Sequence, residues 1–394
     1  MERERGRDPE HRAELPRVPC AACFAAASGA EPAKMRRVAQ DCDPKTYMYM
    51  ASGRKDARIG HFSPGEHRCG EASRTLEGKP ARAGIWYNRC MIKTSVNLGG
   101  LEMPTFLATA SGTFGYGFEY VGAVDYSKLG AVTAKGIRIE QWPGNAMPRH
   151  AEVPGGLVNA IGLQGTGVEH FLKYTVPWYR QQVKGVPLIA NIWGSSVEGY
   201  AEVAAQMGDA VDAVEMNVSC PNVKAGGHTF GQDPKVLSEV VSAVRKATKL
   251  PLIVKLAPNV PSIVPYVKAC EDAGADALSM INTIPAMVID IEKRVPVLAN
   301  VTGGLSGRGI HPAAVKLVYD AHKATKLPIL AMGGVYEAKA AIEFLLAGAT
   351  AVAVGTATFS NPGTVSEVYD GVVAYCERHG FASVSALTGA LAEG

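Results

Sequence analysis

Eight short apolar runs between positions 91 and 394 constrain most strongly what this chain can fold into. Each run is apolar along nearly its whole length rather than at alternate positions, which is typical of strands buried on both faces of a parallel sheet. Amphipathic segments with helical spacing lie between several of them. The runs cover residues 104–110, 131–137, 187–193, 213–219, 251–256, 277–282, 328–332 and 351–356, and the clearest helical segments cover residues 233–248, 261–273, 311–325 and 336–347.

The helical segments carry signals for where they begin and end. Asp233-Pro234 and His311-Pro312 place a proline in the first helical turn, and Gly274 and Gly348 stand where helices should stop. Eight strand–helix units in about 300 residues fit a (β/α)8 barrel better than an open sheet, which more often has five or six strands. The sequence therefore predicts an α/β fold with a (β/α)8 TIM barrel as catalytic domain over residues 91–394.

The first ninety residues differ in composition from the rest. Residues 1–90 contain 17 Lys and Arg against 12 Asp and Glu, whereas residues 91–394 contain 23 against 25. The N-terminal part has little periodic apolar pattern and is rich in Arg, Gly and Pro, so we expect a poorly structured extension or a start assigned upstream of a true start at Met91.

The N-terminal part also holds five of the eight cysteines. Cys20 and Cys23 form a Cys-x-x-Cys pair, to which Cys42 and Cys69 would have to add the remaining metal ligands. The spacings after the first pair are long and include no second close pair, so we predict no metal site there.

Charge and hydropathy argue against two classes of partner. The chain has 40 Lys and Arg against 37 Asp and Glu, so no strong positive field recruits nucleic acid or acidic lipid. No stretch reaches the roughly 18 uninterrupted apolar residues of a membrane-spanning helix. The body contains only Cys220, Cys270 and Cys376, widely spaced, which suggests reduced thiols and a cytoplasmic protein.

Polar residues follow the predicted strands where each strand ends. In a barrel of this kind the active site lies at the carboxyl ends of the strands. Lysine and asparagine side chains are costly to bury without partners, so we expect a ligand rich in hydrogen-bond donors and acceptors. The residues concerned are Ser111, Lys135, Gly136, Asn191, Asn217, Lys255, Ile281, Asn282 and Thr283.

Glycines gather around the last two predicted strands. In barrels this region often binds a phosphate through backbone N–H groups and a helix N-terminus, and glycine lets the phosphate approach closely. Glycine pairs after strands also serve plain tight turns. The residues are Gly303, Gly304 and Gly307 before the seventh run, Gly333 and Gly334 at its end, and Gly355 with Thr356 at the end of the eighth.

Cys220 lies in a polar, glycine-rich loop over residues 217–227. A cysteine at a barrel mouth is a candidate base or nucleophile, because access matters as much as its pKa. Cys270 and Cys376 lie on predicted helices, and we interpret them as small buried apolar residues.

Several of these segments together resemble the dihydroorotate dehydrogenases, and among them the class 1B catalytic subunits, over roughly residues 91–390. The segments are residues 110–112, 135–136, 159–164, 217–227, 255–259 and 281–283 with the late glycines. The resemblance implies FMN-dependent oxidation of (S)-dihydroorotate to orotate in pyrimidine (UMP) synthesis. Cys220 at the base position, where membrane-associated class 2 enzymes have Ser, indicates class 1, and the continuation Val-Lys-Ala-Gly-Gly and Thr283 are similar to the 1B form.

The resemblance also implies roles for individual residues. Cys220 is the base that removes the proton from ring carbon 5, Lys135 lies between FMN and the substrate carboxylate, and Lys255 lies near the N1 and O2 edge of the flavin. The implied FMN contacts are Ser111, Lys135, Gly136, Asn191, Asn217, Lys255, Ile281, Gly307, Gly333, Gly334, Gly355 and Thr356. The implied substrate contacts are Lys135, Asn159, Ala160, Ile161, Gly162, Leu163, Asn217, Asn222, Asn282 and Thr283.

The sequence of residues 91–394 gives no electron carrier that could follow FMN. It has neither a Gly-x-Gly-x-x-Gly fingerprint after its first strand nor a four-cysteine iron–sulfur set. Class 1B enzymes use a separate subunit with FAD and a [2Fe–2S] cluster that passes electrons to NAD⁺, in a heterotetramer around a homodimer of catalytic subunits. The alternatives are a class 1A-like homodimer that reduces fumarate, an FMN domain like that of dihydropyrimidine dehydrogenases, and an inactive flavin-binding barrel.

Overall fold

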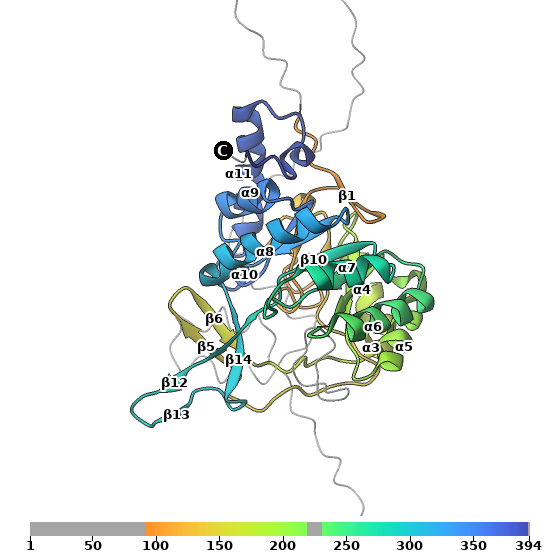
Figure 1. Ribbon diagram of the computed structural model, residues 1–394, viewed down its shortest axis with the longest axis vertical. Helices are drawn as coiled ribbons and strands as arrows, with labels where there is room; N and C mark the ends of the chain where they lie inside the picture. Colours follow the sequence, from red (N-terminus) through yellow and green to blue (C-terminus); the bar gives the residue numbers. More distant parts are fainter. Residues whose placement is uncertain (1–90, 219–230, 393–394) are drawn as a thin grey trace, which may run out of the picture. The chain divides into compact units, whose positions relative to one another are not determined.

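The computed structural model describes residues 91–218 and 231–392, and Figure 1 shows the order of their helices and strands. The predicted extension over residues 1–90, with Cys20, Cys23, Cys42 and Cys69, lies outside the described residues. So do Cys220 and Asn222.

All eight predicted runs form strands of one parallel sheet. Neighbours in the order β3-β16-β15-β10-β9-β8-β7-β4 are hydrogen-bonded, and a parallel bridge between Ala108 and Ala131 joins β3 to the start of β4. The sheet is therefore nearly closed, and the prediction of a (β/α)8 barrel is confirmed. The strands are β3 (Leu107–Thr109), β4 (Val132–Thr133), β7 (Leu188–Ile192), β8 (Ala213–Asn217), β9 (Leu252–Lys255), β10 (Ala277–Met280), β15 (Ile329–Met332) and β16 (Ala351–Val354).

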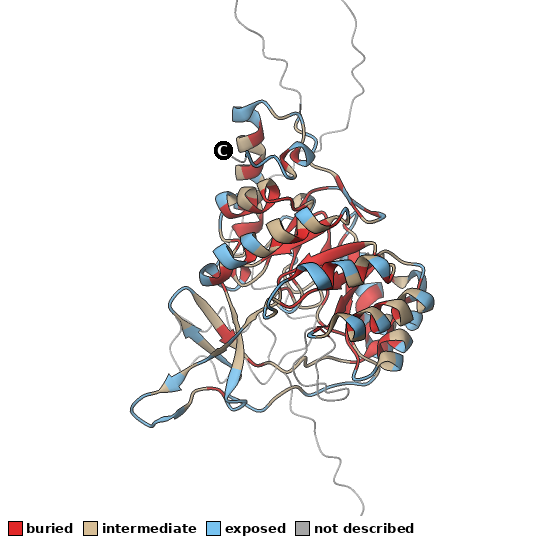
Figure 2. Cartoon of the chain, viewed as in Figure 1, coloured by how far each residue is buried: buried red, intermediate tan, exposed pale blue. Residues whose placement is uncertain are grey.

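Helices cover the outside of this sheet, and Figure 2 shows buried strands behind helices whose outer faces are exposed. The four predicted helical segments form α6 to α9. In α6 the Asp233 side chain accepts a hydrogen bond from the Lys235 N–H and Pro234 is the first residue, as the sequence indicated. The helices are α3 (Val168–His170), α4 (Val176–Gln182), α5 (Val197–Met207), α6 (Pro234–Ala247), α7 (Val264–Asp272), α8 (His311–Ala324), α9 (Ala338–Leu346), α10 (Ala357–Ser360) and α11 (Thr364–His379).

A second, antiparallel sheet was not foreseen from the sequence. Its strand order is β11-β14-β6-β5, and its chain segments are inserted after β4 and after β10. A two-stranded hairpin continues from it, and Figure 1 shows the labels of that hairpin beyond β14. The strands are β5 (His150–Val153), β6 (Gly156–Asn159), β11 (Ile284–Met287) and β14 (Thr302–Ser306), with the hairpin β12 (Ile289–Asp290) and β13 (Val295–Pro296); a separate hairpin, β1 (Val96–Leu98) and β2 (Leu101–Met103), precedes the barrel.

Two glycines that suggested a phosphate loop lie inside this second sheet. Gly303 and Gly304 are residues of β14. A Cβ atom on Gly303 would come within 2.5 Å of the Asn159 carbonyl oxygen, and one on Gly304 would come within 2.6 Å of the Thr283 Cβ. These glycines therefore let β14 pack closely against its neighbours, and the glycines that face the barrel mouth are the later ones.

No helix among residues 91–218 and 231–392 combines the length and the hydropathy that crossing a bilayer requires.

Candidate functional site

One pocket lies at the carboxyl ends of the barrel strands. It brings together residues that follow β3, β9, β10, β15 and β16 with the end of β14. Most of its polar lining consists of residues that the sequence had singled out. The lining is Ala110, Ser111, Thr113, Lys255, Ile281, Asn282, Thr283, Ser306, Gly307, Ile310, Met332, Gly333, Gly334, Val335, Tyr336, Gly355 and Thr356.

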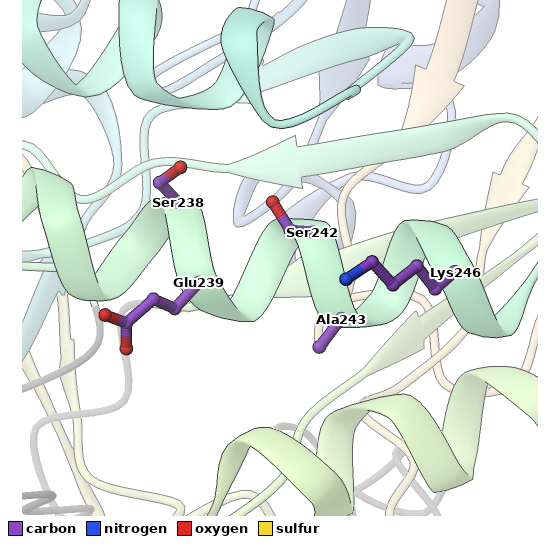
Figure 3. Close-up of a pocket in the computed structure, with 5 residues that line it drawn as sticks. All are labelled: Ser238, Glu239, Ser242, Ala243 and Lys246. Carbon is purple, nitrogen blue, oxygen red and sulfur yellow. The ribbon is translucent and has the colours of Figure 1, made fainter.

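A second hollow lies on the outer face of α6, and Figure 3 shows its lining. The lining residues are Ser238, Glu239, Ser242, Ala243 and Lys246. It contains none of the predicted site residues, and its two charged side chains, of opposite sign, are exposed. The pocket at the strand ends is therefore the candidate site.

The glycine side of the pocket meets the beginning of α8. Gly333 and Gly334 have φ angles of +128° and +74°, a region that residues with a Cβ rarely adopt. A Cβ on Gly334 would come within 2.7 Å of the His311 Cβ, at the first residue of α8. Backbone N–H groups beside a helix N-terminus suit a phosphate, so this side of the pocket fits the phosphate end of FMN.

A buried carboxylate, Glu215, links its own strand to side chains of β7, β9 and β10. Glu215 lies in β8 and is fully buried. Its Oε2 accepts a hydrogen bond from Asn191 Nδ2 at 2.5 Å, and its Oε1 accepts one from Ser279 Oγ at 2.7 Å. Lys255 Nζ lies 3.9 Å from the same Oε2 and is itself buried. Sequence reasoning missed Glu215, although a charged residue inside an otherwise apolar run was the available signal.

Asn191 keeps one hydrogen-bonding atom without a partner. Its Oδ1 is one of the few buried side-chain polar atoms in the described part of the chain that have none. An unsatisfied buried acceptor costs about 1–3 kcal/mol, so the atom suits a ligand that carries an N–H group. The pyrimidine ring of a flavin carries one such group, at N3, so this acceptor fits FMN.

Three of the predicted substrate residues are linked by hydrogen bonds and close contacts. Asn282 Nδ2 donates to Asn217 Oδ1 at 3.2 Å, and Asn282 Oδ1 accepts from the Thr283 N–H at 2.8 Å. Tyr200 Oη donates to the Asn217 carbonyl oxygen at 2.7 Å, which fixes the end of β8. Amides that both donate and accept are therefore held side by side at the mouth.

The segment from Asn159 to Leu163 is held by the second sheet. Asn159 lies opposite Gly304 in the β6 and β14 pairing, and its Nδ2 donates to the Gly304 carbonyl oxygen at 3.4 Å. Asn145 fixes the following turn, because its Nδ2 donates to the Ala160 carbonyl oxygen at 2.9 Å and its N–H to that of Ile161 at 3.0 Å. Gly162 and Leu163 then both take positive φ angles, +74° and +57°.

Lys135 follows β4 and is partly buried. Burial lowers the pKa of its ammonium, the nearby Arg149 lowers the pKa further, and Glu119 opposes both effects. Burial in turn raises the pKa of Glu119, although backbone N–H groups of Tyr116 and Phe118 donate to its carboxylate. Two cations, Lys135 and Arg149, thus lie near each other and suit an anionic ligand.

The structure thus brings only part of the predicted set to the pocket wall. Ser111, Lys255, Ile281, Asn282 and Thr283 line it together with the late glycines and Thr356. The other described predictions do not line it, although Asn217 is hydrogen-bonded to the lining residue Asn282 and Asn191 is linked to Lys255 through Glu215. Those that do not line it are Lys135, Gly136, Asn159, Ala160, Ile161, Gly162, Leu163, Asn191 and Asn217.

Comparison with known proteins identifies what this chain is similar to. Residues 93–375 match the family described as dihydroorotate dehydrogenase. The chain is 50% identical over 299 residues, 75% of its length, to a protein of Pelobacter propionicus named dihydroorotate dehydrogenase B (NAD(+)), catalytic subunit, and the match covers 98% of that protein. Proteins of the same name from Alkaliphilus metalliredigens and Trichlorobacter lovleyi are 48% and 49% identical over 301 and 300 residues, which cover 76% and 75% of this chain and 99% and 98% of those proteins.

Proposed function

The chain belongs to the dihydroorotate dehydrogenase family, and we propose that it oxidises (S)-dihydroorotate to orotate in pyrimidine biosynthesis, as the catalytic subunit of an NAD⁺-linked enzyme. The single observation that carries the proposal is the match over almost the whole length of relatives with that name. The pocket at the strand ends supports it, because polar residues converge there in a fold whose active sites lie at that face.

FMN is the cofactor that the residues of this site fit. When bound, it accepts the hydride from ring carbon 6 of the substrate. Gly307, Gly333, Gly334 and Gly355 would hold its phosphate end, together with Ser111 and Thr356. Lys255 would hold a positive charge against the ring edge, which favours the negative charge that develops there on reduction.

The substrate side of the proposal rests on the amides and cations around the mouth. The amides of Asn217 and Asn282 suit the cyclic imide of dihydroorotate, because each can donate and accept. Asn159, Thr283 and the turn that contains Leu163 would complete the contacts. Lys135 would bind the substrate carboxylate. Asn222, outside the described residues, is a further substrate contact that the family resemblance implies.

Cys220 is the proposed base, and it would take the proton from ring carbon 5. It follows the end of β8 by three residues in the sequence, and Tyr200 and Lys255 fix the end of that strand from two sides. A thiol has an ordinary pKa near 8.5, so a modest lowering suffices for it to act at neutral pH.

The electrons would leave through a partner subunit with FAD and a [2Fe–2S] cluster, which reduces NAD⁺. Support comes from the names of the relatives, which describe a catalytic subunit and NAD(+). A heterotetramer around a homodimer of this chain and a cytoplasmic location belong to the same proposal. The free thiols of Cys270 and Cys376 are consistent with a reducing compartment.

We also propose that residues 91–394 form the catalytic domain and that residues 1–90 take no part in the reaction. The family match lies entirely within the former range. A chain that begins at Met91 should therefore bind FMN and oxidise dihydroorotate as the full chain does. Loss of FMN binding on that truncation would contradict this division.

The identity of the electron acceptor, NAD⁺ or fumarate, distinguishes the proposed function from its main alternative. The purified chain should reduce NAD⁺ with dihydroorotate only when a candidate FAD and iron–sulfur subunit is added. Rapid fumarate reduction by the chain alone, without NAD⁺ reduction in the presence of that subunit, would instead identify a class 1A-like enzyme.

A further inference from the structure

The hydrogen bonds of Glu215 determine which atom of Asn191 faces which way. A carboxylate has oxygen acceptors only, so the atom that Asn191 turns toward Glu215 Oε2 has to be its amide nitrogen. The nitrogen lies 2.5 Å from Oε2, and both residues are almost completely buried. The amide oxygen of Asn191 must then face away from Glu215, and it is the atom that has no partner.

That oxygen is buried, and its neighbour on the side of β4 is a glycine. Gly136 lies next to it, and a Cβ atom at this position would come within 3.3 Å of Asn191 Oδ1 and within 3.3 Å of Trp193 Cδ1. Because Gly136 has no side chain, no Cβ atom stands against the amide oxygen from this direction. The acceptor is therefore buried, fixed in direction and without a hydrogen-bond partner among the described residues.

The Oε2 atom of Glu215, which holds Asn191, also holds a hydrogen-bond donor, the ammonium group of Lys255. Lys255 Nζ lies 3.9 Å from Glu215 Oε2, the atom that also holds Asn191, and Lys255 lines the pocket. The carboxylate of Glu215 thus holds both the ammonium group of Lys255, a donor, and the amide of Asn191, whose oxygen is an acceptor. An imide edge, with a carbonyl oxygen next to an N–H group, has the complementary order, and the pyrimidine ring of a flavin carries such an edge.

We propose that Glu215 is a positioning residue that fixes the polarity of the Asn191 amide, so that the cofactor site presents an acceptor and selects a ring with an N–H group at that point. The inference rests on the proposed binding of FMN and goes beyond it. The competing explanation is that Glu215 only balances the charge of Lys255, which would affect every flavin equally.

The substitution that separates the two explanations is Glu215→Gln. A glutamine side chain has an amide nitrogen as well as an oxygen, so Asn191 can turn over and bond its own oxygen to that nitrogen. The acceptor would then be lost to the ligand while the shape of the buried cluster is kept. Ser279→Ala is the matched control, because it removes the bond to Oε1 and leaves the bond between Oε2 and Asn191 in place.

The readout is the affinity of the protein, stripped of its own flavin, for two probes, measured by quenching of flavin fluorescence. One probe is FMN, and the other is 3-methyl-FMN, in which a methyl group replaces the N–H hydrogen. The wild-type protein and Ser279→Ala should bind FMN more tightly than 3-methyl-FMN. Glu215→Gln should lose about tenfold in FMN affinity, with much less change for 3-methyl-FMN, so that the preference falls.

Three outcomes have distinct meanings. An equal loss for both probes in Glu215→Gln, or no loss for either, would overturn the inference and leave the proposed function intact. Failure of the wild-type protein to bind FMN at all would overturn the proposed function and the inference with it. If Glu215→Gln does not fold, Asn191→Ala carries the same comparison, since it removes the acceptor directly; an undiminished preference for FMN in that variant would overturn the inference.

Discussion

The barrel and the antiparallel sheet inserted into it are stabilised in different ways. Every residue of the eight barrel strands is buried, and their apolar side chains belong to one large core. The inserted strands β5, β11 and β14 are half-buried or exposed, and their sheet shares a small core of Val158, Ala160 and Leu298. Figure 2 shows the same contrast in its colours. The large core therefore lies in the barrel, whereas the inserted sheet adds only a small one.

The largest effect should come from the base that follows a barrel strand. Cys220→Ser should slow reduction of the bound flavin by dihydroorotate by about 100-fold to 1,000-fold at neutral pH, because an alcohol is a much weaker base than a thiol. Rapid mixing under anaerobic conditions measures the rate. FMN content should stay unchanged, and a rate equal to that of the wild type would remove Cys220 from the mechanism.

A matched pair of isoleucines compares the stability of the two regions. Ile329 in β15 is fully buried, whereas Ile289 in β12 is 54% exposed. Ile329→Ala should lower the free energy of unfolding by about 2–5 kcal/mol, and Ile289→Ala should change it by less than about 0.5 kcal/mol. Urea unfolding measures both, and similar losses would contradict the contrast between the regions.

Gly304→Ala should affect substrate binding rather than chemistry. The added Cβ would lie 2.6 Å from the Thr283 Cβ, so β14 and Thr283 would have to move apart. We expect KM for dihydroorotate to rise about tenfold with little change in kcat, because the substrate and the transition state would be bound less tightly by the same amount. Gly309→Ala is the control, since its Cβ would meet nothing nearer than 3.6 Å, and a fall in kcat with unchanged KM would place Gly304 in the chemical step instead.

Lys255→Gln tests the charge that the barrel holds beside the pocket. Glutamine keeps a hydrogen-bond donor for Glu215 but removes the positive charge, so reduced FMN should be less stable. We expect the two-electron potential of the flavin to fall by about 30 mV, equivalent to about 1.4 kcal/mol, in a redox titration. Lys316→Gln on α8, an exposed lysine paired with Asp320, should leave the potential unchanged. An unchanged potential in Lys255→Gln would move Lys255 away from the ring.

The smallest effect should be a dependence of substrate binding on pH. Burial lowers the pKa of Lys135, so its charge is lost at a lower pH than that of an exposed lysine. If the charged form binds the substrate carboxylate, as proposed, KM should stay constant below that pKa and rise several-fold as the pH increases through it. Lys135→Arg, which stays charged, should abolish the rise. A rise of equal size in Lys135→Arg would assign it to another group.

The barrel could be predicted from the sequence because its physical cause is visible there. Strands such as β7 and β16 are buried on both faces, so nearly every position is apolar, and the helix signals at Asp233 and Gly274 stand where the structure uses them. The inserted sheet could not be predicted, because its strands are short and partly exposed and because Gly303 and Gly304 in β14 resemble a loop.

The sequence could predict which polar residues lie at the ends of the strands, but not the hydrogen bonds that connect them. Ser111, Lys255 and Asn282 follow strands and line the pocket, as their places in the sequence indicated. The direction of the Asn191 amide depends on Glu215, which is 24 residues away in the chain, and only the pairing of β7 with β8 brings the two together. The roles of all these residues in binding and catalysis remain predictions, as do those of Cys220 and Asn222.

We propose that this barrel removes a proton and a hydride from dihydroorotate at its mouth. The most direct measurement mixes the FMN-loaded chain with dihydroorotate in the absence of oxygen and any other acceptor, and follows the flavin absorbance and the orotate formed. The yellow colour should be lost, with about one orotate formed for each FMN reduced. A flavin that stays oxidised in the presence of excess dihydroorotate would contradict it.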